Sequence, residues 1–136
     1  MFKVVNGMRT IEFGQPGNSR FQLVNFVVNG NKRATAGLLS DYQAEGEPIE
    51  HVGERLAVLN NDDSVAAIVE VTEIDVLPFL EVPDRFALAE AEGDLNAEDF
   101  RNSHREYWQR TVEGFTEDEL VVTMYFDVVE IVSQPN

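Results

Sequence analysis

The spacing of hydrophobic and polar residues predicts short strands alternating with amphipathic helices. Strands are predicted over residues 2–5, 8–13, 34–39, 55–59, 65–76 and 121–132. The first two flank Asn6-Gly7, a pair that tolerates positive φ and is typical of a hairpin turn. A polar tetrapeptide over residues 60–63 predicts an antiparallel pairing of the strands on either side of it. The last strand is continuous in β-branched and aromatic residues, which indicates burial on both faces.

Helices are predicted where apolar residues recur at three- and four-residue intervals. The predicted helices cover residues 20–29, 83–92 and 96–111. Ser19 is the expected N-cap of the first helix, and Gly30 is its expected left-handed stop. Asn96 and Asp99 have the spacing of a capping pair at the start of the last helix. The polar segment 40–51 contains Gly46 and Pro48 and predicts a long loop.

Composition is that of a single-domain globular protein, and the mixture of predicted strands and helices indicates the α+β class. Its 136 residues suffice for one domain, which we expect to span residues 1–136. With no cysteine and only two histidines, the sequence favours neither a disulfide nor a metal site, and it suggests no cofactor. No apolar run approaches the length that crosses a bilayer, so we expect a cytoplasmic protein. The net charge of −15 argues against binding to long duplex nucleic acid.

The stretch from Gly30 to Leu39 contains the strongest candidate chemistry, because Lys32 and Thr35 place an amine and a hydroxyl three positions apart just after a helix end. A threonine hydroxyl becomes a nucleophile only when a base takes its proton. Lysine can be that base if burial or a neighbouring cation, here Arg33, lowers its pKa. Backbone N–H groups between Gly30 and Ala36 would stabilise an oxyanion. The alternative is structural: the lysine pairs with helix-end carbonyls and the threonine begins a strand.

The last predicted helix carries a face of His104, Trp108 and other aromatic residues. Trp108 could stack on a nucleobase, although aromatic residues at helical spacing also pack cores. His104 is either a hydrogen-bonded core residue or a ligand contact. Glu70 alternates with buried valines in its strand and therefore points either into a cleft or into solvent.

The order of these motifs resembles the ASCH domain, a branch of the PUA-like superfamily. The resemblance rests on the order and spacing of strings along most of the chain: Gly-x-Lys-x-x-Thr at 30–35, Ala-Gly-Leu-Leu at 36–39, Glu-Gly-Glu-Pro at 45–48, Val-Gly at 52–53, residues 68–74, Pro-Phe at 78–79, Glu-Ala-Glu-Gly-Asp at 90–94, and 115–129. It implies a PUA-like mixed β-barrel with flanking helices. Two positions depart from the family pattern: Arg33 follows the motif lysine, where threonine is common, and Gly37 replaces an arginine found in some members.

The resemblance also implies a function related to RNA or nucleosides. One branch of the family removes acetyl from N(4)-acetylcytidine without a metal, using a lysine, a threonine and a glutamate. These roles fall on Lys32, Thr35 and Glu92, with Glu90 as the alternative acid. The other expected ligand contacts are Gly30, Arg33, Ala36, Glu47, Glu70, His104 and Trp108.

Three functions are therefore open. The first is a pocket for a small nucleoside beside Lys32, with amidohydrolase activity on acylated pyrimidines. The second is a noncatalytic module for single-stranded RNA, or a weak ribonuclease, which the acidic charge disfavours. The third is a protein-interaction domain, for which Lys32 would have no ligand-facing role.

Overall fold

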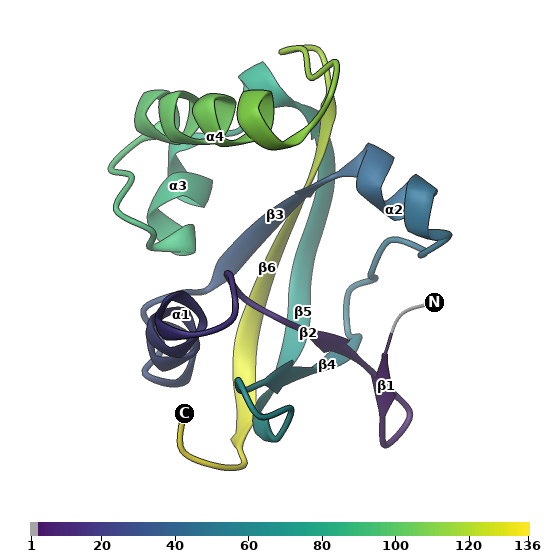
Figure 1. Ribbon diagram of the computed structural model, residues 1–136, viewed down its shortest axis with the longest axis vertical. Helices are drawn as coiled ribbons and strands as arrows, with labels where there is room; N and C mark the ends of the chain where they lie inside the picture. The colour runs from purple at the N-terminus through teal and green to yellow at the C-terminus, as the bar shows by residue number, and fades with distance from the viewer. Residues whose placement is uncertain (1–2) are drawn as a thin grey trace.

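The computed structural model describes residues 3–136, which form a six-stranded sheet in the order β1-β2-β4-β5-β6-β3 (Figure 1). The strands are β1 (Val4–Val5), β2 (Met8–Ile11), β3 (Ala34–Leu38), β4 (Arg55–Leu59), β5 (Val65–Pro78) and β6 (Leu120–Ile131). β2 and β4 pair in parallel, and the other neighbours are antiparallel. The two long strands β5 and β6 run the length of the molecule and support the other elements (Figure 1).

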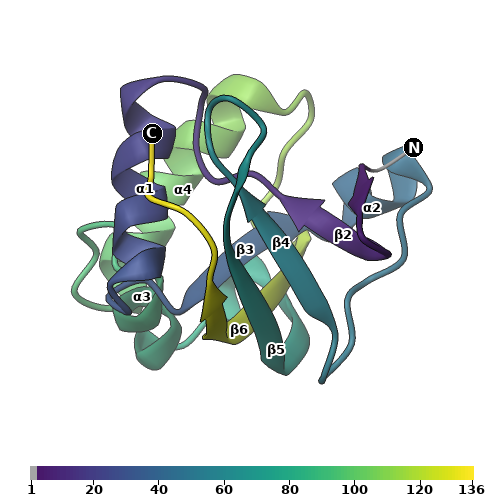
Figure 2. The same ribbon diagram turned by 90° about the horizontal axis from the view of Figure 1, so that it is seen from below.

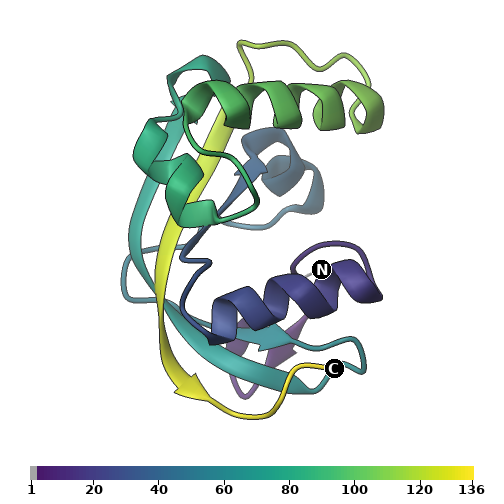
Figure 3. The same cartoon turned by 90° about the vertical axis from the view of Figure 1, so that its left-hand side faces the viewer.

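Four α-helices and one 3₁₀ turn surround the sheet in this part of the chain. They are α1 (Asn18–Val28), α2 (Leu39–Glu45), η1 (Phe79–Glu81), α3 (Asp84–Glu90) and α4 (Ala97–Thr111). α1 lies on one side of β5 and β6 with α3 and α4, and β3 passes between them (Figure 3). In Figure 2, α1 and α2 lie at opposite flanks of the molecule, with the strands between them. Over residues 3–136, no helix combines the length and apolarity needed to cross a membrane.

Two hydrophobic cores lie along the long strands. One joins α1 to β4, β5 and the middle of β6, with Phe13, Val24 and Phe126 among its buried residues. The other joins β3, η1, α3 and α4, where Phe100 and Trp108 are buried. Aromatic rings interlock in the second core: the edge-to-face pair of Phe79 with Trp108 has its centroids 5.7 Å apart. The fold is thus two packed units that share one sheet.

Most predicted elements are present in the structure. Asn6 and Gly7 both have positive φ, as the hairpin requires, and Phe2 lies outside the described residues. Gly30 ends α1 with a φ of 85°. The Asn96 side chain accepts a hydrogen bond from the backbone N–H of Asp99 and so caps α4. The mixed α+β class is confirmed.

Four details differ from the expectation. The described sheet is open rather than a closed barrel, because its edge strands β1 and β3 do not pair with each other. The predicted loop at 40–51 begins as helix α2, which is stopped by Gly46 at a φ of 64°. α1 starts at Asn18, after Gly17, so Ser19 is not its cap. β6 is buried only as far as Phe126, and the residues after it are mostly exposed, although Val128 still packs against the first core.

Candidate functional site

Lys32 is buried at the junction of the two cores. Gly30 turns the chain out of α1, and the Lys32 backbone N–H then donates to the carbonyl of Phe26 at 2.9 Å. The side chain turns inward and the residue is only 1% exposed. Its ammonium donates to the Glu92 carboxylate at 2.7 Å and to the carbonyls of Ala34 and Glu90 at 2.9 and 3.1 Å. Each of its three hydrogens therefore has an acceptor.

A cavity of about 470 Å³ lies next to this ion pair, within the size range of small-molecule sites. It is lined by Glu12, Phe13, Gly14, Gln15, Ser19, Leu23, Thr35, Ala36, Glu90, Glu92, Asp94, Ser103, His104, Tyr107 and Trp108. These residues come from α1 and the loop before it, from β3, and from α3, α4 and the loop between them (Figure 3). The cavity is thus located between the two cores.

Thr35 and Glu92 both line this cavity although they are far apart in the sequence. Thr35 is carried on β3, opposite Met124 of β6. The Glu92 side chain is 34% exposed, whereas that of Lys32 is fully covered. The carboxylate is therefore the member of the ion pair that a ligand would meet.

Glu90 is the most deeply buried acid of the site. It is 2% exposed, and its Oε1 atom has no hydrogen-bond partner within the part of the chain that the structure describes. Burial, together with the negative charge of Glu92, raises the pKa of Glu90 to about 8, although the Lys32 charge opposes this. In the absence of a bound cation, Glu90 is therefore protonated at neutral pH.

His104 and Trp108 form the aromatic wall on α4. The His104 ring stacks on Phe100 with centroids 4.0 Å apart and lies 5.2 Å from the Trp108 ring. Burial lowers the pKa of His104, so the ring is neutral at pH 7. Trp108 is only 5% exposed, packs in the second core and also lines the cavity. Tyr107 is 42% exposed and is the more accessible aromatic ring.

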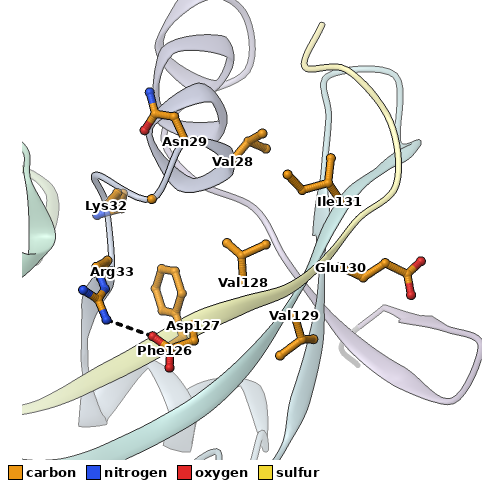
Figure 4. Close-up of a pocket in the computed structure, with 11 residues that line it drawn as sticks. Val28, Asn29, Lys32, Arg33, Phe126, Asp127, Val128, Val129, Glu130 and Ile131 are labelled. Carbon is orange, nitrogen blue, oxygen red and sulfur yellow. Dashed lines mark hydrogen bonds and ion pairs between the residues drawn. The ribbon is translucent and has the colours of Figure 1, made fainter.

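The structure separates other predicted site residues from this cavity. Gly30 and Arg33 line a second hollow of about 620 Å³ between the end of α1 and the outer half of β6 (Figure 4). Arg33 is directed to Asp127, with an N–O distance of 3.0 Å, and its side chain is 62% exposed. Lys32 borders this hollow too, but its amine is paired with Glu92. The Arg33 guanidinium is thus paired with Asp127, and Arg33 does not line the cavity that contains Thr35 and Glu92.

Two predicted acids also lie elsewhere. Glu47 borders a third hollow and forms an ion pair with the buried Arg9 at 3.4 Å. Glu70 accepts a hydrogen bond from Arg55 across the β4–β5 pair at 3.2 Å. Neither Glu70 nor Arg55 lines any of the three hollows described above. Ala36, His104 and Trp108, by contrast, line the same cavity as Thr35 and Glu92.

Sequence reasoning left the position of Glu90 open and did not single out Asp94. A signal for Glu90 was available, because Phe86 and Ala87 precede it by four and three residues and are both fully buried. Helical spacing therefore places Glu90 on the buried face of α3. Asp94 is in a loop, where periodicity gives no information about orientation.

Comparisons with known proteins establish the family. The family model described as the ASCH domain matches residues 9–130, so the chain belongs to the ASCH-domain family. A crystal structure of an ASCH domain from Lactobacillus crispatus JV V101 is 28% identical, with a TM-score of 0.77, and the match covers 89% of this chain and 79% of that one. The protein EF3133 from Enterococcus faecalis V583 is 27% identical, with a TM-score of 0.75 and coverage of 88% and 75%.

More distant likenesses show the fold alone. A point mutant of an ASCH protein from Zymomonas mobilis is 14% identical, with a TM-score of 0.57, and the match covers 85% of this chain and 69% of that one. No curated protein matches the chain.

Proposed function

We propose that the cavity beside Lys32 binds an acylated pyrimidine nucleoside and that the chain hydrolyses its amide bond, with N(4)-acetylcytidine as the representative substrate. The observation that carries this proposal is the convergence of three residues. Lys32 and Glu92 form an ion pair at 2.7 Å, and Thr35 and Glu92 line one cavity. A nucleophile, a carboxylate and a fixed positive charge are the parts that an acyl transfer needs.

In the proposed reaction, Thr35 is the nucleophile and Glu92 is the group that moves the proton. Every hydrogen of the Lys32 ammonium already faces an acceptor, which favours Glu92 over Lys32 as the base. Glu92 takes the hydroxyl proton as the Thr35 oxygen bonds to the acyl carbon. The C–N bond then breaks, and the proton passes from Glu92 to the departing exocyclic amine. Glu92 next takes a proton from water as the water oxygen bonds to the acyl carbon. The bond between the Thr35 oxygen and the acyl carbon then breaks, the acid leaves, and the proton returns from Glu92 to the Thr35 oxygen.

Lys32 would act through Glu92 rather than on the substrate. Its ammonium holds the Glu92 carboxylate in position, since the ammonium is itself anchored on two backbone carbonyls. This divides the roles of the three residues: Thr35 forms the covalent bond, Glu92 transfers the proton, and Lys32 positions Glu92.

The charge of the cavity favours a neutral nucleoside over RNA. Four carboxyl groups line it, from Glu12, Glu90, Glu92 and Asp94, and no lysine or arginine is among the described residues that line it. A phosphodiester would be repelled, whereas a nucleoside offers amide, hydroxyl and ring groups for hydrogen bonding. The exposed ring of Tyr107 supplies a surface on which a base can stack.

The test is release of cytidine from N(4)-acetylcytidine by the purified chain, followed by chromatography. Thr35→Val removes the hydroxyl and keeps the shape of the side chain, and Thr35→Ser is its matched control because it retains a hydroxyl. We expect Thr35→Val to lose at least about 100-fold in kcat, Thr35→Ser to keep measurable activity, and Glu92→Gln to be inactive. Equal rates for wild type and Thr35→Val would refute the proposed nucleophile.

Other outcomes favour the alternative functions. No cytidine release at high protein concentration, together with a steeply salt-dependent gel shift with single-stranded RNA, would favour the RNA-binding module. A folded Lys32 variant that is indistinguishable from wild type in nucleoside and RNA assays would favour a protein-interaction domain. Circular dichroism must accompany each Lys32 variant, because this side chain is also part of the buried structure.

A further inference from the structure

Three potential metal ligands meet on the α4 side of the cavity. Glu90 ends α3, Asp94 follows in the loop and His104 lies in the middle of α4. One ligand atom from each residue lies within 4.8 Å of the corresponding atoms of the other two. All three side chains line the cavity, so a group bound among them would remain accessible to a small molecule.

An independent observation is the unpartnered carboxyl oxygen of Glu90. Buried polar atoms in proteins are nearly always hydrogen-bonded, yet Oε1 of this residue, only 2% exposed, has no partner among residues 3–136. His104 Nε2 faces it at 3.6 Å. This separation is too long for a hydrogen bond, and it leaves room for a positive centre between the two atoms.

The hydrogen bonds around His104 fix which ring nitrogen faces Glu90. His104 Nδ1 lies 3.1 Å from the carbonyl oxygen of Phe100, which can only accept, so Nδ1 carries the hydrogen. Nε2 then presents its lone pair to Glu90. Asp94 is held by the Ser103 hydroxyl, which is 3.2 Å from both carboxylate oxygens. Such outer contacts on a histidine and a carboxylate are typical of metal ligands.

We propose that Glu90, Asp94 and His104 bind a divalent transition-metal ion, with Zn²⁺ as the representative ion. An imidazole with two carboxylates suits Zn²⁺ better than Mg²⁺ or Ca²⁺, which prefer oxygen ligands alone. Charge supports this: before a metal binds, the carboxylates of Glu92 and Asp94 outnumber the Lys32 ammonium by one, and a bound cation would displace the proton of Glu90 and add a further negative charge. Three protein ligands leave a coordination position open to the cavity. The sequence alone had favoured no metal site. Metal binding at these three residues does not depend on the proposed amidohydrolase activity.

The first test uses the unaltered chain, so it is insensitive to misfolded variants. The chain has two histidines, and the exposed His51 serves as an internal control, with a side chain that is 76% exposed. Zn²⁺ is added to chelator-treated protein while the ring nitrogens are followed by ¹⁵N NMR. We expect a saturable shift of His104 Nε2 at one equivalent and none at His51. A shift at His51 alone, or none at His104, would overturn the proposal.

The second test measures Zn²⁺ affinity by calorimetry in variants shown to be folded by circular dichroism. We expect His104→Gln and Glu90→Gln each to weaken binding at least tenfold. His51→Gln and Glu106→Gln are the matched controls, the latter on the same helix with a side chain that is 79% exposed, and both should leave affinity unchanged. Equal affinity in wild type and His104→Gln would contradict the site, and it would indicate that Glu90 shares a proton with the imidazole instead.

The optical signal of the only tryptophan gives a third readout. Trp108 lies 5.2 Å from the His104 ring, so Co²⁺ bound at this site should quench its fluorescence, and Zn²⁺ should reverse the quenching. Cytidine release is measured separately, with and without chelator. Failure to bind metal would therefore leave the amidohydrolase test intact, and failure to release cytidine would leave the metal-binding tests intact.

Discussion

Replacing Lys32 with methionine tests whether this amine is a structural anchor. The change keeps the length and apolar stem of the side chain but removes three donated hydrogen bonds. Two of the abandoned acceptors are backbone carbonyls beside a fully covered side chain, and each unsatisfied acceptor costs about 1–2 kcal/mol. The Glu92 carboxylate is 34% exposed and can be solvated, so we discount its contribution. The expected loss of stability is about 3 kcal/mol.

Urea unfolding followed by Trp108 fluorescence measures this loss, and a loss of this size lowers the Tm of a chain of this length by about 10 °C. Lys3→Met is the matched control, because Lys3 is the other lysine and its side chain is 51% exposed. We expect the control to change stability by less than about 0.5 kcal/mol. A loss below about 1 kcal/mol for Lys32→Met would refute the argument that the ammonium anchors the two cores.

Three further results are expected. In the presence of a chelator, the free energy of unfolding of the wild type should fall by on the order of 3 kcal/mol between about pH 4.5 and 7. Over this range Glu90 keeps its proton in the folded chain and loses it in the unfolded chain. Urea titrations at each pH measure the fall, and Glu90→Gln should remove it. Hydrogen bonding to Arg9 lowers the pKa of Glu54, so this pair stabilises the fold above the ordinary glutamate pKa, and the stabilisation is lost as the pH falls. Arg9→Met should therefore cost about 2 kcal/mol at pH 7 and less near pH 3, which the Tm at each pH would show. Gly46→Ala should cost about 1 kcal/mol in urea unfolding because φ is 64°, even though no non-neighbouring atom of the described residues lies within 4 Å of the added carbon. No change in stability would contradict the strain.

Local physics explains which elements could be predicted. Asn6-Gly7 and Gly30 were informative because the conformations they adopt are accessible to few residue types. Asn96 was informative because a capping side chain acts on a backbone group only three residues away. Helix α2 was missed because it is short and polar, and Tyr42 holds it through a hydrogen bond to Glu50 at 2.8 Å, beyond the end of the helix.

The candidate site, too, was only partly predictable from local sequence. Spacing alone drew attention to Lys32 and Thr35, and the resemblance added Glu92. No periodicity could show that Arg33 turns toward Asp127 while its neighbour Lys32 turns inward, because successive side chains after a helix end have no fixed period. The partner of each depends on strands and loops that arrive from elsewhere in the chain.

The sequence by itself determined the α+β class, the turns and caps, and the motif that identifies the family, because these depend on neighbouring residues and on burial periodicity. Tertiary structure alone decided that the described sheet stays open, that Oε1 of Glu90 has no hydrogen-bond partner among residues 3–136, and that this atom lies 3.6 Å from His104 Nε2. The physical reason is that pKa values, ligand geometry and hydrogen-bond satisfaction depend on atoms a few ångströms away in space, and packing of the two cores is what brings those atoms together.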